Sequence, residues 1–128
     1  MNPPTPTIDA LLHGRIDIHS HLLTDVDDGC ANFDKVSQSV DQLISFGYVG
    51  SICTFHINPH VFLRNTPVLL ESLTEQLSGQ LKQAGVSYRV WSGGELTLFD
   101  GVIDCLKHHG VPTLVESRCV ITDFRKGD

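Results

Sequence analysis

The sequence has no run of basic residues and no long apolar stretch. Its 128 residues include 9 Lys and Arg against 15 Asp and Glu, a formal net charge of -6, which argues against a nucleic-acid partner. No apolar segment approaches the ~20 residues that a membrane-spanning helix needs, so we expect no membrane insertion. The hydrophobic content of 41% and the charged content of 19% are typical of a globular protein.

The cysteines are few in number, and their spacing forms no motif. The four cysteines are Cys30, Cys53, Cys105 and Cys119, and none lies in a Cys-x-x-Cys pair. This favours free thiols in a reducing cytoplasm over disulfides or a zinc knuckle. No base is evident to activate Cys30, so the pattern does not indicate a cysteine phosphatase. Residues 1–14 lack the basic and apolar parts of a signal peptide, and we expect a flexible lead-in to one domain over residues 15–128.

Three segments have helical periodicity and clear end signals. Asn32 is a good N-cap and Gly47 a natural stop, which predicts a helix over residues 33–46. Thr66-Pro67 opens a second helix that ends at Gly85. A shorter helix is predicted over residues 100–109. The apolar positions expected to face the core are Val36, Val40, Leu43, Ile44, Leu70, Leu73, Leu77, Leu81, Ala84, Val102, Ile103 and Leu106.

Apolar, β-branched segments alternate with these helices. Strands are predicted over residues 16–21, 49–55, 86–91 and 119–122, with a brief extended piece at 113–115. Strands that alternate with helices indicate an α/β fold of βα units with parallel strands, arranged as a sheet or a barrel.

A ligand-type side chain stands at the end of every predicted strand. His19 and His21 follow the first, and His56, Glu95 and Asp123 follow the others in turn. Functional groups gather at the carboxyl ends of parallel strands, so this order predicts a site with more than one divalent metal ion. Imidazole and carboxylate ligands without thiolate suit Mn, Fe or Zn, and the carboxylate share favours Mn. Such ions can clamp a phosphate and activate water.

Several of these residues also have plain structural interpretations. Asp27 and Asp28 precede Gly29 as turn formers do; we favour turn chemistry for Asp27 and a functional role for Asp28. A lone His56 would be structural. Arg64 can meet a phosphate near the site or be a solvated loop arginine. Gly93 and Gly94 permit a close approach of the backbone to a bound group, which favours function for Glu95.

These motifs resemble those of the polymerase-and-histidinol-phosphatase (PHP) superfamily, and within it the manganese-dependent protein-tyrosine phosphatases of capsular and exopolysaccharide operons. The first motif is Ile-Asp-Ile-His-Ser-His at residues 16–21, followed by Val-Asp-Asp-Gly at 26–29. Cys-Thr-Phe-His at 53–56 is similar to the family's Ala-Thr-Pro-His, with Phe55 in place of proline. Gly-Gly-Glu at 93–95 and the strand that ends at Asp123, where the family has glutamate, complete the likeness.

The resemblance implies half of a distorted TIM-like (PHP) barrel. It also implies metal-ligand roles for His19, His21, His56, Glu95 and Asp123, with Asp28 close to the metals and catalytic. The implied activity is hydrolysis of phosphotyrosine on a tyrosine autokinase of polysaccharide export. Two alternatives are a small-molecule phosphatase of the histidinol-phosphatase type and a non-catalytic remnant that binds metal or acts through protein contacts.

Two further family motifs, His-Pro-Glu-Arg and Ser-Asp-Ala-His, do not occur in these 128 residues. In the family they supply more metal ligands and a phosphate-binding arginine. We therefore expect hydrolysis by this chain alone to be weak or absent. A half barrel also leaves strand edges unpaired, so we expect self-association unless a second half is supplied.

Overall fold

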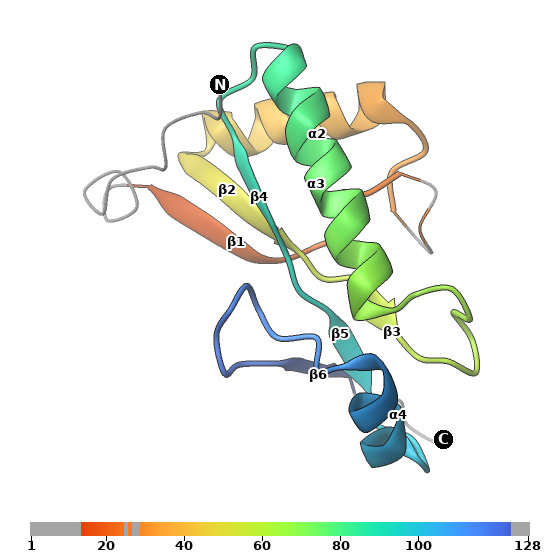
Figure 1. Cartoon of the computed structure of the whole chain (residues 1–128). Coiled ribbons are helices and arrows are strands. Elements are labelled where there is room, and N and C mark those ends of the chain that lie inside the picture. The colour runs from red at the N-terminus through yellow and green to blue at the C-terminus, as the bar shows by residue number, and fades with distance from the viewer. Residues whose placement is uncertain (1–13, 25, 27–28, 124–128) are drawn as a thin grey trace.

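The computed structural model describes residues 14–24, 26 and 29–123, which form three helices and six strands (Figure 1). In chain order these are β1 (Arg15–Ser20), α2 (Phe33–Ser45), β2 (Tyr48–Cys53), β3 (His56–Ile57), α3 (Pro67–Gln83), β4 (Arg89–Ser92), β5 (Glu95–Thr97), α4 (Val102–His109) and β6 (Ile121–Asp123). No helix in the described part of the chain is long and apolar enough to cross a membrane.

The strands form two parallel sheets, in the orders β1-β2-β4 and β3-β5-β6. The second sheet lies at the carboxyl ends of the first, because β3 continues the path of β2 and β5 continues that of β4 (Figure 1). The predicted α/β class with parallel strands is confirmed. The break between the sheets is the place where the candidate site forms.

The second and third predicted strands are wrong in extent. The segment 49–55 is not continuous: β2 ends at Cys53 and β3 begins at His56. The backbone still follows β1 at Thr54, whose N–H donates to the Ser20 carbonyl at 2.8 Å and whose hydroxyl accepts from the Ser20 N–H at 3.1 Å. The strand predicted over 86–91 begins only at Arg89. The N–H of Val86 donates to the Leu81 carbonyl at 2.9 Å, which ties this residue to the end of α3.

The segment before the last strand also differs from the prediction. Residues 113–115 are not extended: the Ser117 N–H donates to the Leu114 carbonyl at 3.1 Å, and Val115 has a φ of 57°. The N–H of Leu114 donates to the Cys119 carbonyl at 2.8 Å, so residues 114–119 form a closed turn. The final strand therefore starts at Ile121 rather than at residue 119.

The helix predictions hold within one or two residues. Asn32 Oδ1 accepts from the Lys35 N–H at 3.0 Å, and Thr66 Oγ1 accepts from the Leu69 N–H at 3.2 Å, so both predicted N-caps are confirmed. Three positions expected to face the core are exposed instead. Ile44 and Ile103 are 41% and 61% exposed, and Ala84 is the exposed C-cap of α3.

The apolar core lies where α2 and α3 pack against the strands. Val36 and Val40 of α2 are fully buried, and the stripe on α3 is buried at three of its leucines, Leu70, Leu77 and Leu81. Cys53 and Phe55 face these helices at the end of β2 and just beyond it. The apolar core thus packs against the ends of the strands, and this packing holds the backbone of the candidate site in place.

Candidate metal centre

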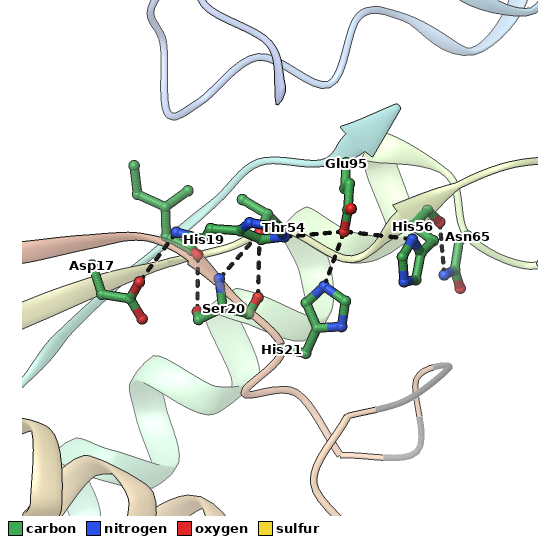
Figure 2. Close-up of polar contacts among 9 residues, drawn as sticks. Asp17, His19, Ser20, His21, Thr54, His56, Asn65 and Glu95 are labelled. Carbon is green, nitrogen blue, oxygen red and sulfur yellow. Dashed lines mark hydrogen bonds and ion pairs between the residues drawn. The ribbon is translucent and has the colours of Figure 1, made fainter. Parts of the chain in front are cut away.

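The end of β1 is fixed to the end of β2 by a compact set of hydrogen bonds. Besides its two backbone bonds to Thr54, Ser20 donates from its hydroxyl to the Ile52 carbonyl at 2.9 Å. The pairing register shifts between Asp17 and Ser20, and Asp17 Oδ1 accepts from the His19 N–H at 3.1 Å. These contacts hold the backbone from which both His19 and His21 project (Figure 2).

Three imidazole rings converge on one carboxylate oxygen. Glu95 Oε2 lies 3.1 Å from His19 Nε2, 3.3 Å from His21 Nε2 and 3.5 Å from His56 Nδ1. Figure 2 shows the Glu95 side chain between the three rings. The side chains of His56 and Glu95 are each 11% exposed, whereas that of His19 is 50% exposed. The cluster is therefore closed at its base and open to solvent at His19.

Glu95 belongs to two groups of ligand-type atoms. One consists of His19, His21 and Glu95, and the other of His56, Glu95 and Asp123. Within each group the nitrogen and oxygen atoms lie within 4.8 Å of one another. His56 and Glu95 pair in register on β3 and β5, and Asp123 ends β6 beside them. Two neighbouring ion positions that share one carboxylate fit this arrangement.

The spacing and chemistry of the cluster suit a divalent ion. Two ligand atoms that each lie about 2.1 Å from one ion are roughly 3–3.5 Å apart, and the three nitrogen–oxygen distances fall in that range. Imidazole nitrogen with carboxylate oxygen is a donor set of Mn, Fe and Zn sites. The residues present therefore fit a metal ion.

Aromatic contacts set the orientation of two of the rings. The ring of His56 stacks on Phe62, with centroids 5.0 Å apart and planes at 13°. The ring of His21 lies 4.8 Å from that of Phe55, a fully buried residue. The carbonyl of His56 accepts from Asn65 Nδ2 at 2.9 Å. Phe62 and Asn65 lie on a loop without a regular pattern, so nothing in the sequence singled them out.

The other residues that the sequence analysis considered lie outside this cluster or outside the described residues. Asp28 and Asp27 lie outside the described residues. Arg64 is exposed in the turn before α3, next to Asn65, and belongs to neither group of ligand-type atoms. The glycines before Glu95 approach this chain itself rather than a ligand: a Cβ at Gly94 would lie 2.5 Å from Pro112 Cβ. All four cysteines are free thiols, and Cys53 is buried.

The fold and the cluster define an α/β protein with a histidine–carboxylate centre at the carboxyl ends of its parallel strands. The chain belongs to the CpsB/CapC family of capsular polysaccharide synthesis proteins, whose sequence profile matches residues 15–128. The matched range contains every residue of the cluster.

Two curated relatives are among the proteins similar to this chain. "Putative tyrosine-protein phosphatase CapC" of Staphylococcus aureus is 26% identical over 110 residues, and tyrosine-protein phosphatase YwqE of Bacillus subtilis is 25% identical over 109. Each match covers 85% of this chain and 42% of the relative. This chain thus spans less than half the length of these two relatives.

The structural match supports the fold. It comes from crystal structures of YwqE from B. subtilis and CpsB from Streptococcus pneumoniae, described as unique metal-dependent tyrosine phosphatases. The TM-score is 0.78 at 24% identity, over 87% of this chain and 44% of the matched one. The arrangement of parallel strands and helices is therefore that of part of this larger fold.

Proposed function

We propose that this chain carries the metal-binding part of a phosphoesterase that hydrolyses phosphotyrosine in proteins. The observation that carries the proposal is the convergence of His19, His21 and His56 on a single Glu95 oxygen. Membership of the capsular polysaccharide synthesis family and the names of its relatives support the choice of phosphotyrosine over a small phosphate ester.

In this proposal His19, His21 and Glu95 hold one divalent ion, and His56, Glu95 and Asp123 hold a second. The bound ions would polarise the phosphoryl oxygens and activate water for in-line attack. The chain itself supplies the imidazoles: the ring of His56 stacks on Phe62, and that of His21 contacts Phe55 at a tilt. The cluster is open to solvent at His19, and we propose that the phosphotyrosine side chain approaches from this side.

Finer assignments belong to the same proposal. Manganese is the metal we favour, because the carboxylates of Glu95 and Asp123 suit a harder ion than zinc. Asp28 acts close to the metals as a catalytic carboxylate. We propose that Arg64, which is exposed on the same loop as Asn65, binds the phosphate of the substrate. The expected partner is a phosphorylated tyrosine autokinase of polysaccharide export, in the cytoplasm.

The first experiment measures metal binding. The purified chain is titrated with Mn²⁺, and bound metal is quantified by calorimetry and elemental analysis. We expect the double variant His19→Ala/His21→Ala to lose most of the bound metal, because two of the three ligands of one group are gone. Variant His108→Ala/His109→Ala removes two exposed histidines at the end of α4 and serves as a matched control. Equal metal content in all three proteins would refute the site.

The second experiment measures hydrolysis with Mn²⁺ bound. A slow release of phosphate from a phosphotyrosine peptide is expected, and it should disappear in His19→Ala/His21→Ala. Each lost transition-state contact costs on the order of 10²–10³ in rate, so a low rate is consistent with ligands that this chain does not supply. Faster turnover of histidinol phosphate than of the peptide would contradict the assignment of substrate.

A further inference from the structure

Thr97 has a buried hydroxyl with no hydrogen-bond partner in the described part of the chain. The residue is only 2% exposed, and its Oγ1 makes no hydrogen bond with any described residue. Buried hydroxyl groups nearly always have a partner, because leaving one unpaired costs its full desolvation. Such an exception calls for an explanation, and the position of Thr97 suggests one.

Thr97 lies on the same face of β5 as Glu95. Side chains two residues apart on a strand point to the same side, while Leu96 between them packs in the apolar core. On the neighbouring strand, Thr97 pairs in register with Asp123. The orphan hydroxyl is therefore flanked along its own strand by Glu95 and across the sheet by Asp123, both members of one ligand-type group.

We infer that Thr97 is a positioning residue of the metal centre, whose hydroxyl donates to the Asp123 carboxylate when that carboxylate turns to an ion. The inference depends on the proposed metal centre and adds a residue to it. Carboxylates that bind metals are themselves held by hydrogen bonds, and loss of such a partner typically lowers metal affinity 10–100-fold. Thr97, which pairs in register with Asp123, is placed to act as such a partner.

A purely structural role makes the opposite prediction about the metal-free protein. Valine has the shape of threonine without the hydroxyl, and it suits a buried strand position. If the hydroxyl stabilised the fold by itself, Thr97→Val would lower the melting temperature without metal. Because Oγ1 is unpaired here, we expect the metal-free melting temperature of Thr97→Val to equal or exceed that of the wild type.

The test compares Thr97→Val, Thr97→Ser and Thr122→Val by Mn²⁺ calorimetry and by melting with and without metal. Thr122 is exposed on β6, one position from Asp123, so Thr122→Val makes the same chemical change on the opposite face. Thr97→Val should bind Mn²⁺ about 10-fold or more weakly and show a smaller metal-induced rise in melting temperature. Thr97→Ser and Thr122→Val should behave as the wild type.

A second comparison, made in a variant that lacks the Asp123 carboxylate, tests whether the loss of metal affinity depends on Asp123. In Asp123→Ala, the further change Thr97→Val should alter metal affinity less than 2-fold, because the acceptor is gone. Equal Mn²⁺ affinity in wild type and Thr97→Val would overturn the role of Thr97 without contradicting the proposed metal centre. Failure of the wild-type chain to bind Mn²⁺ would overturn the metal centre, and the role of Thr97 with it.

Discussion

At the scale of single residues, burial raises the pKa of two side chains in the core. Burial raises the pKa of the Cys53 thiol from 9.0 to about 12, and it raises that of the Tyr88 phenol from 10.0 to about 12. Cys53 is fully buried, and the Tyr88 hydroxyl is hydrogen-bonded to Ser51. Both groups stay protonated in the folded chain at a pH where the unfolded chain has lost those protons.

This difference predicts a loss of stability in alkali. Since the unfolded state releases the two protons first, the free energy of unfolding should fall as the pH rises from about 9 to 12. The slope is at most about 1.4 kcal/mol per pH unit for each proton. Tyr88→Phe should reduce the slope between pH 10 and 12, measured by urea unfolding. A stability profile that rises over this range would contradict the assignment.

At the scale of elements, the sequence predicts helices and strands where the signal lies in neighbouring residues. Asn32 and Thr66 cap their helices with the bonds that their side chains predict. The break between β2 and β3 has no such signal. The residues around Thr54 are apolar or β-branched, as in any buried strand, and the hydrogen bonds of Thr54 are to Ser20, far away in sequence. Sequence could place ligands at strand ends, but not the register that brings them together.

Glu95 and Thr97 also differ in what the sequence shows: the first has a signal in the sequence, and the second does not. A ligand-type residue after a strand is visible in the sequence, and so Glu95 was found. An unpaired hydroxyl two residues later is visible only when its surroundings are known, because threonine is common in any strand. Asp123 is an intermediate case. An aspartate by itself does not indicate a metal ligand, and only its position at the end of the last predicted strand did so.

Two glycine-to-alanine substitutions should have opposite effects at the element scale. Between β4 and β5, a Cβ at Gly94 would lie 2.5 Å from Pro112 Cβ and 3.0 Å from Ile57 Cγ1. Gly94→Ala should therefore destabilise the chain by about 1–3 kcal/mol. On α3, a Cβ at Gly79 meets nothing within 4 Å, so Gly79→Ala should stabilise by about 0.5–1 kcal/mol. Thermal unfolding without metal measures both, and equal shifts would contradict the packing at the strand break.

At the scale of the whole molecule, the described strands leave sheet edges unpaired. β1 ends the first sheet and β6 ends the second, and both lie at the outside of the ribbon in Figure 1. Ile18 on β1 is 56% exposed, so an apolar side chain lies on an edge strand. Unpaired backbone groups beside exposed apolar surface are a template for pairing with another chain.

We therefore expect the 128-residue chain to self-associate as its concentration rises, which light scattering coupled to size exclusion will show. Ile18→Lys should shift the chain toward the monomer, because a charge on an edge strand opposes pairing. Phe46→Lys makes a similar change at a 69% exposed apolar residue beyond the end of α2, and it should leave association unchanged. Hydrogen exchange gives a second measure, since amides of β6 should exchange faster than those of β2, which pairs on both sides. A monodisperse monomer with strongly protected amides over residues 120–123 would show that these edges are not open.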